Sequence, residues 1–332
     1  MDYLPLENKD VMKDLLFAIR DKGKKIGIAL GSGGARGIAH IGVLEVFEEY
    51  GIPIDFIAGT SIGAVVGALY AAGVPLKEIK NFSLSLDKKR TMALFDPALN
   101  FSGMFSGRKI VSLLRDLGLK GLSFSDLKIP FSAVATDMYS GRKVVINKGS
   151  VVMAVRASSS IPMVFAPVIY KDYYLVDGGV VDPVPVSVVK EMGADIVVAV
   201  RLSDYRDREP ITIEIEEEED EEREGLLTRI RRLEKLREGK IDLRIPVHRR
   251  KEKPMRFTDI VAIASDIMGR IVEEKSIEDA DLVISPYKDD LHGERIKTFE
   301  FYRASEAIEK GRKATLNSIK DFYKNVNKIL FD

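Results

Sequence analysis

The stretch FIAGTSIGAVVGALYAAG, Phe56 to Gly73, decides the fold of this 332-residue chain because it joins a buried strand directly to a helix. Residues 56–58 are the apolar end of a strand. The apolar residues after them recur at helical spacing: Ala64, Val65, Ala68, Leu69 and Ala72. The strand must therefore turn sharply at Ser61. Such a turn strains the backbone and leaves no room for nearby side chains, which is a steric reason for Gly59 and Gly63.

Residues 59–63, with the sequence GTSIG, match the GxSxG nucleophile elbow. In that motif the serine oxygen is lifted clear of a strand end, and the following helix N-terminus points at a developing oxyanion. A tight turn without any chemistry satisfies the same short pattern. The sequence on both sides of Ser61 therefore has to decide between an active site and a plain turn.

The amino-acid composition limits which folds, partners and kinds of site the chain can have. Hydrophobic residues make up 45% of the chain, enough for a large α/β core. The 51 basic and 51 acidic side chains cancel, so no global field attracts the protein to nucleic acid, and we expect no nucleic-acid partner. The chain has no cysteine, which excludes disulfides, thiol nucleophiles and cysteine metal sites. The N-terminus lacks a signal profile and no apolar run could span a bilayer, so we expect a cytoplasmic protein.

A glycine loop and a helix precede the Ser61 stretch. Residues 25–30 form an apolar strand, GSGGARG follows, residues 38–50 have helical periodicity, and residues 53–58 return as a strand. This βαβα order predicts parallel strands whose carboxyl ends lie together, so the two glycine loops should be neighbours. Further strands are predicted at 130–136, 143–147, 166–170, 195–200 and 280–286. The predicted fold class is α/β, with a mostly parallel central sheet flanked by helices.

Changes in composition along the sequence predict the domain organisation. Residues 1–23 read as an N-terminal helical extension and residues 321–332 as a C-terminal helical tail. The main domain spans 24–320 and is interrupted at 204–256 by a charged helical insertion, an acidic block followed by a basic one.

The loop GSGGARG, Gly31 to Gly37, resembles a dinucleotide-binding loop only in its placement. The sixth position of GxGxxG, counted from Gly31, is Arg36, and the lysine of a P-loop is absent. What remains is a set of unshielded backbone N–H groups at a helix N-terminus beside Ser61. They would suit an oxyanion hole with Gly33, Gly34 and Ile62 as donors. A glycine turn without chemistry is the alternative.

A serine nucleophile needs a base, and the chain has only three histidines. His40 lies on a helix with an apolar inner face and is expected to be a packed residue, while His248 falls in the charged insertion and His292 near the C-terminal part. The other candidate is Asp177, which lies at the end of an apolar strand and is followed by two glycines at 178 and 179. A direct charge-assisted hydrogen bond to the serine would strengthen this carboxylate as a base. For Asp182, which precedes a proline, a turn-forming role is expected.

The blocks GGARG, GTSIG and DGG, in this order, resemble the patatin-like phospholipase family. RASSSIPMVFAPV (156–168) and FYRASEAIEKG (301–311) extend the resemblance over roughly 24–320. It implies a three-layer patatin-like architecture and a Ser-Asp dyad without histidine, with Ser61 as nucleophile and Asp177 as base. The resemblance also implies Gly33 and Gly34 as oxyanion donors and Arg36 as a basic residue that orients or pairs locally. The supporting glycines are Gly31, Gly37, Gly59, Gly63, Gly178 and Gly179.

The reaction that the resemblance implies is hydrolysis of a carboxylic ester in a lipid, through an acyl-enzyme on Ser61 with Asp177 serving both steps. No metal or organic cofactor is expected. Two alternatives stay open. One is acyl transfer to an alcohol or lysolipid by the same dyad, and the other is a non-catalytic lipid-binding or regulatory module.

The charged insertion contains a predicted basic amphipathic helix within 215–239, preceded by the acidic run Glu216 to Glu222. Its apolar residues recur at helical spacing: Leu226, Leu227, Ile230, Leu233 and Leu236. Such a helix could make peripheral contact with an anionic membrane. The alternative is that its leucines pack on the main domain or on a second subunit of an oligomer. Binding of the protein to anionic vesicles would distinguish the two.

Overall fold

The structure is a computed structural model that describes residues 9–94, 96, 104–203, 269, 271–288 and 296–331. The chain divides into two units, Met1–Tyr205 with Ile260–Asp332, and Arg206–Asp259. The second unit lies outside the described residues, as do the predicted amphipathic helix, His248 and His292. The fold below is that of the first unit.

Strands and helices alternate along most of the first unit. The strands are β1 (Ile26–Leu30), β2 (Phe56–Thr60), β3 (Phe131–Asp137), β4 (Lys143–Ile146), β5 (Val168–Tyr170), β6 (Tyr173–Asp177), β7 (Ile196–Val200) and β8 (Leu282–Ile284). The helices are α1 (Lys9–Asp21), α2 (Ala39–Tyr50), α3 (Ile62–Ala71), α4 (Leu76–Leu84), α5 (Lys88–Ala93), α6 (Arg108–Leu114), α7 (Val151–Ser158), α8 (Val186–Glu191) and α11 (Ala304–Phe331). No helix in the described ranges is long and apolar enough to cross a membrane.

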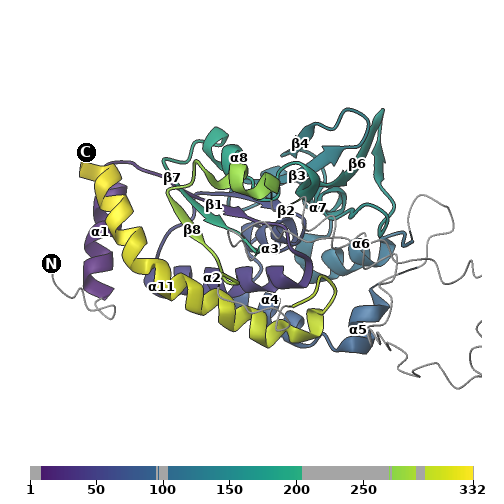
Figure 1. Cartoon of the computed structure of the whole chain (residues 1–332), viewed down its shortest axis with the longest axis horizontal. Coiled ribbons are helices and arrows are strands. Elements are labelled where there is room, and N and C mark those ends of the chain that lie inside the picture. The colour runs from purple at the N-terminus through teal and green to yellow at the C-terminus, as the bar shows by residue number, and fades with distance from the viewer. Residues whose placement is uncertain are drawn as a thin grey trace, which may run out of the picture. The chain divides into compact units, whose positions relative to one another are not determined.

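The strands form one mixed sheet in the order β5-β6-β3-β2-β1-β7-β8, with β4 paired to β3. The central pairings from β3 through β2, β1 and β7 to β8 are parallel. Strands β4, β5 and β6 add an antiparallel edge. The predicted α/β class with a mostly parallel sheet is confirmed, and Figure 1 shows the helices around it. Parallel pairing places the carboxyl ends of β1 and β2 side by side, where Leu30 is opposite Gly59.

Both faces of the central sheet are buried, which gives three layers. Side chains alternate along each strand, so Ile28 of β1 faces the large core that α2, α3 and α11 cover, whereas Ala29 faces a smaller core under α8. Figure 1 shows α2, α4 and α11 on one side of the sheet and α8 on the other. Strands β1 and β7 therefore consist almost entirely of apolar residues, and apolar and polar positions do not alternate along them.

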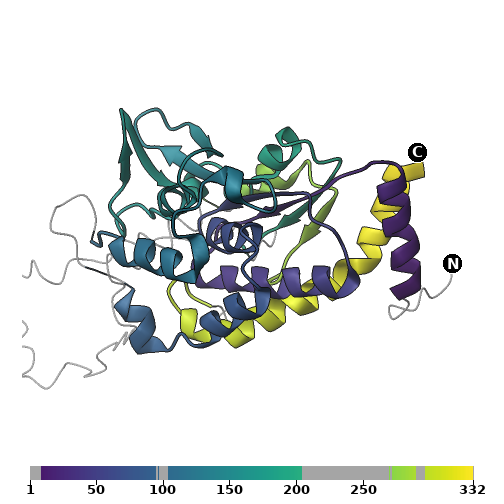
Figure 2. The same ribbon diagram turned by 180° about the vertical axis from the view of Figure 1, so that it is seen from behind.

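Helix α11 lies along α2 and ends beside α1, as both ribbon views show (Figures 1 and 2). The crossing of α2 and α11 is close because both helices have a glycine there. A Cβ on Gly42 would lie 2.0 Å from the carbonyl oxygen of Ile308, and one on Gly311 would lie 2.0 Å from that of Ala39. This contact fixes the helix that follows the glycine loop.

The turn at Ser61 has the strain that the sequence predicts. Strand β2 ends at Thr60, α3 begins at Ile62, and Ser61 between them has φ 56° and ψ −121°. A Cβ on Gly59 would lie 2.5 Å from the carbonyl oxygen of Gly63. One on Gly63 would lie 2.1 Å from the carbonyl oxygen of Leu30. The steric reason for both glycines is confirmed.

We expect Gly63→Ala to destabilise the fold strongly, because the new methyl group meets the backbone of Leu30 at the end of β1 and of Gly31 in the glycine loop. Overpacking of this kind costs about 2 kcal/mol or more of the free energy of unfolding. Gly67→Ala in the same helix is the matched control, since its Cβ would meet only side-chain atoms, at 3.0 Å or more. Urea denaturation measures both variants. Equal losses for the two would contradict the packing described for the turn.

Candidate active site

Ser61 is buried at the N-terminus of α3, with 4% of its surface exposed. Its backbone is held on both sides. The amide donates to Ser158 Oγ at 2.9 Å, and the carbonyl accepts from the amide of Ala64 at 2.9 Å and from Ser159 Oγ at 3.4 Å. The turn thus places one serine side chain at the carboxyl edge of the sheet in a fixed orientation.

Asp177 is the last residue of β6 and is also buried, with 4% exposed. Its amide donates to the carbonyl of Ser160 at 2.9 Å, and its carbonyl accepts from Thr136 Oγ1 at 2.9 Å. The carboxylate Oδ1 accepts from the amide of Gly179 at 2.8 Å. Oδ2 is buried and has no partner with hydrogen-bond geometry among the described residues. One carboxylate oxygen is therefore committed and the other is available.

Burial raises the pKa of Asp177 from 3.8 to about 6, because the charged form loses solvation. The Ser61 hydroxyl and the Gly179 amide lower this pKa in part. The hydroxyl of Ser61 thus lies near enough to stabilise the carboxylate, although without the alignment of a full hydrogen bond to Oδ2. Catalytic hydrogen bonds are often loose before substrate binds. A carboxylate with a pKa of about 6 is a stronger base than an exposed one.

The glycine loop lies against the same edge, and its amides fall into two sets. Those of Gly31, Ser32 and Ala35 donate to the carbonyls of Val200, Pro183 and Thr298 at 2.8–3.0 Å. In the described part of the chain the structure gives no acceptor for the amides of Gly33, Gly34 and Ile62. These three are the predicted oxyanion donors. Backbone N–H groups without a partner at the start of a helical segment can bind an anion.

The rest of the loop is packed tightly on its surroundings. Arg36 is buried, and its Nε donates to the carbonyl of Gly33 at 3.3 Å. Burial raises the pKa of Glu273, and the charges of Arg201 and Arg36 oppose that rise, so Arg36 also faces a carboxylate. A Cβ on Gly37 would lie 2.1 Å from the Ile62 side chain. The loop therefore cannot move independently of α3.

His40 is fully buried in α2, and its Nε2 lies 2.8 Å from the carbonyl oxygen of Gly31. Burial lowers its pKa to about 4, so the ring is neutral at physiological pH. The predicted packed role is confirmed. Asp182, predicted to form a turn, has an additional role, since its Oδ2 pairs with Lys143 Nζ at 3.0 Å.

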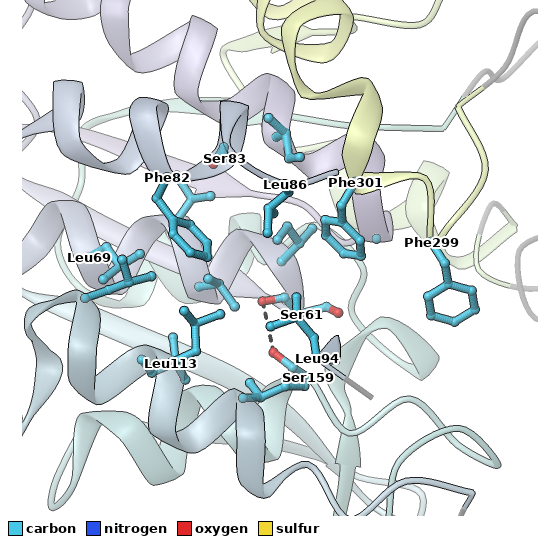
Figure 3. Close-up of a pocket in the computed structure, with 18 of the residues that line it drawn as sticks. Ser61, Leu69, Phe82, Ser83, Leu86, Leu94, Leu113, Ser159, Phe299 and Phe301 are labelled. Atoms are coloured by element: carbon cyan, nitrogen blue, oxygen red, sulfur yellow. Dashed lines mark hydrogen bonds between the residues drawn. The ribbon is translucent and has the colours of Figure 1, made fainter. Parts of the chain in front are cut away.

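A cavity of about 140 Å³ begins at Ser61. It follows α3 past Ile62 and Val65 to Leu69, and its other walls come from α4, α6 and the segment before α11. Figure 3 shows Ser61 with Phe82, Leu69 and Leu113 around the cavity and Phe299 farther off. The lining is almost entirely aliphatic and aromatic, including Ile79, Phe82, Leu86, Ile110, Leu114, Leu117, Phe165 and Phe301. Such a cavity suits an alkyl chain rather than a polar ligand.

Sequence reasoning did not find two parts of this site. Ser158 and Ser159 contact Ser61 from 97 and 98 residues away, and the only signal was the run of three serines after Ala157. Thr298 contacts the glycine loop from the opposite end of the chain. The described residues hold no cluster of three or more His, Asp or Glu side chains that could bind a metal ion.

Comparison with known proteins relates this site to one family. Residues 28–190 match the family described as patatin-like phospholipase. An NTE family protein of Mycobacterium tuberculosis is 40% identical over 201 residues, which are 58% of this chain and 55% of that protein. Neuropathy target esterase sws of Drosophila melanogaster is 35% identical over 190 residues, 56% of this chain and 13% of that protein. A lysophospholipase of Yarrowia lipolytica is 36% identical over 196 residues, 57% and 13%.

The family match over residues 28–190 contains the glycine loop, the Ser61 turn and Asp177. The chain spans about half the length of the mycobacterial relative and a small part of the other two. Among solved structures, VipD from Legionella pneumophila has a TM-score of 0.44 and 16% identity, over 90% of this chain and 66% of that one.

The buried carboxylate predicts a pH dependence of stability. Between the unfolded pKa of 3.8 and the folded pKa of about 6, the native state binds more protons than the unfolded state, so raising the pH lowers the free energy of unfolding. The full loss is about 3 kcal/mol. Asp177→Asn removes it, so the variant should gain stability over the parent as pH rises from 4.5 to 7.5. Thermal denaturation at both pH values measures this.

The matched control is Asp116→Asn, which changes an exposed carboxylate in the same way. It should alter stability little at either pH. If Asp177→Asn also shows no pH-dependent gain, the carboxylate is not buried in the folded protein as described.

Proposed function

Because the chain belongs to the patatin-like phospholipase family, we propose that it is a serine hydrolase that cleaves carboxylic ester bonds of lipids. One observation carries the proposal: the strained Ser61 turn, the buried Asp177 and an apolar cavity meet at one edge of the sheet. The names of two relatives, an esterase and a lysophospholipase, support the same class of reaction.

In the first step, Ser61 Oγ attacks the ester carbonyl carbon while Asp177 Oδ2 takes the hydroxyl proton. Oδ2 has no other partner among the described residues, and Oδ1 stays bonded to Gly179, which holds the carboxylate in place. The raised pKa of Asp177 makes this transfer less uphill than it would be to an exposed carboxylate. The carbonyl π bond opens, and its electron pair moves to the oxygen.

The oxyanion that forms needs donors already in place. The amides of Gly33, Gly34 and Ile62 lie at the N-termini of the helical segments that follow the two glycine loops. Preorganised N–H groups of this kind favour the tetrahedral state over the flat ester, and losing one such donor costs about 100- to 1,000-fold in kcat. The tight packing of Gly37 on Ile62 keeps the two loops together.

The tetrahedral state then collapses. The leaving alcohol departs with the proton from Asp177, and the acyl group stays on Ser61 as an ester. A water molecule repeats the cycle: Asp177 takes its proton, the hydroxide attacks the acyl carbon, and Ser61 leaves with that proton. The products are a free carboxylic acid and an alcohol, and the enzyme is restored.

The cavity supports an acyl chain of medium length as the group transferred to Ser61. Its volume of about 140 Å³ is close to that of cavities that hold a six-carbon ring. Leu69, the lining residue of α3 that is farthest along the helix from Ser61, is eight helical residues away, which is roughly 12 Å at 1.5 Å per residue. An extended chain of about nine or ten carbons has this length, given bonds of about 1.5 Å. We expect selectivity for about six to ten carbons.

Ser61→Ala should abolish ester hydrolysis, by at least about 10,000-fold, because the proposed acyl-enzyme forms on the Ser61 hydroxyl. The free energy of unfolding should change by less than about 1 kcal/mol, since the hydroxyl contributes little to packing. Hydrolysis of p-nitrophenyl esters with product analysis measures the first, and a fluorophosphonate probe should label the parent at Ser61. Ser112→Ala, on the exposed face of α6, is the matched control and should retain full activity.

The same assays test the base. Asp177→Asn should lose about 1,000-fold or more in kcat, while joint replacement of His40, His248 and His292 leaves substantial turnover. The parent should lose activity as pH falls through about 6, where Asp177 becomes protonated. A folded triple-histidine variant without activity would mean that a histidine is the base.

The cavity predicts a chain-length profile. Leu69→Phe fills part of the cavity at the α3 lining residue farthest from Ser61 and should lower kcat/KM for a decanoyl ester by about 10-fold relative to a butyryl ester. The ratio of the two rates is the measurement, because it cancels any loss of folded enzyme. Leu16→Phe adds the same volume to α1, away from the cavity, and should leave the ratio unchanged. A profile that Leu69→Phe does not alter would place the acyl chain elsewhere.

A further inference from the structure

The three serines that follow Ala157 are buried, although no step of the proposed reaction uses them. Ser158 and Ser160 are 0% exposed and Ser159 is 9% exposed. They lie where α7 ends, beside Ser61. Burying a hydroxyl costs free energy unless the group is hydrogen-bonded, so each of these serines needs a partner.

Ser158 connects the Ser61 turn to the neighbouring strand. Its Oγ donates to the carbonyl of Val134 in β3 at 2.5 Å and accepts from the amide of Ser61 at 2.9 Å. A hydroxyl has one proton, so donation to Val134 leaves the oxygen lone pairs for the Ser61 amide. The rigid strand therefore orients the hydroxyl, and the hydroxyl in turn orients the strained residue.

The Ser61 amide has no other acceptor in the described structure, so loss of the Ser158 hydroxyl would leave a buried donor unpaired. The carbonyl of Ser61 is different. It already accepts from the amides of Ala64 and Val65, and Ser159 Oγ adds only a long contact of 3.4 Å, drawn as the dashed line in Figure 3. Of the two hydroxyls, that of Ser158 should matter more.

The same segment also contacts the proposed base, through Ser160. The carbonyl of Ser160 accepts from the amide of Asp177 at 2.9 Å. The side chain of Ser160 is held by Arg156, whose Nη2 also donates to the carbonyls of Ser106 at 3.0 Å and Ala166 at 2.7 Å. One short segment thus contacts the nucleophile through Ser158 and the base through Ser160.

We propose that Ser158 is a positioning residue that holds the backbone of Ser61 in its strained conformation and aligns the hydroxyl of Ser61 with Asp177. This role rests on the proposed function, because alignment has a purpose only if Ser61 is the nucleophile. Ser158 contacts neither the substrate nor the reacting atoms. Its hydrogen bonds offset part of the strain at φ 56°.

The test is Ser158→Ala, with active sites counted by fluorophosphonate titration and kcat expressed per titrated site. Misalignment of a nucleophile lowers kcat, so we expect a loss of about 10- to 100-fold per site. KM should stay within about 2-fold, and the acid limb of the pH profile should stay near 6, because the cavity and Asp177 are unchanged. Hydrogen exchange of the Ser61 amide, read by mass spectrometry, should become faster.

Three further variants separate the hydrogen bond from packing. Ser158→Cys keeps the volume but replaces the oxygen with a weak acceptor, so its kcat should resemble that of the alanine variant. Ser159→Ala should cost no more than about 3-fold. Ser318→Ala removes a hydroxyl that donates to the carbonyl of Ala314 in α11, outside the site, and should leave all readouts unchanged.

Several outcomes would overturn the proposal. One is wild-type kcat per titrated site in Ser158→Ala with unchanged exchange of the Ser61 amide. Another is a loss confined to the number of titratable sites, or full activity of Ser158→Cys, since both indicate packing alone. If the parent hydrolyses no ester and Ser61 is not labelled, the proposed function fails instead, and the exchange rate of the Ser61 amide still shows whether Ser158 holds the turn.

Discussion

The close approach of α3 to the end of β1 is the contact on which the site depends. Gly63 packs against the carbonyl of Leu30 with no room for a methyl group, and Gly59 packs against Gly63 in the same way. Strands β1 and β2 are both held in a buried parallel sheet and cannot shift apart. The chain must therefore turn at Ser61 within a single residue. The positive φ of Ser61 follows from that constraint, and so does the position of its hydroxyl at the carboxyl edge of the sheet.

Burial then determines the chemistry at this edge. Asp177 has lost its water and has one carboxylate oxygen bonded to Gly179, so its charged form is less stable than in solution. The loss of solvation that destabilises the charged carboxylate also makes it a better proton acceptor. His40 shows the converse effect, since burial keeps its ring neutral and next to the Gly31 carbonyl. The same desolvation therefore strengthens one group as a base and leaves the other a structural residue.

The site is assembled from segments that are distant in sequence. Ser158 reaches Ser61 from α7, Thr298 supports the glycine loop from the stretch before α11, and Phe301 helps to close the cavity. Helix α11 is held in place by its glycine contacts with α2, so the C-terminal segment and the helix after the glycine loop are fixed together. The glycine loop, the cavity wall and the outer helix layer form one packed body.

The sequence by itself determined the order of strands and helices around Ser61, the sharp turn there and the need for its two glycines. These features depend on local periodicity and on steric limits that act within a few residues. The local glycines and the family resemblance also predict Asp177 as the candidate base. Only the tertiary structure decided that Ser158 holds the Ser61 amide, that Asp182 pairs with Lys143, and that Leu69 lines the same cavity as Ser61. Such contacts join residues tens to hundreds of positions apart, and the packing of helices on the sheet, rather than any local pattern, determines which residues meet.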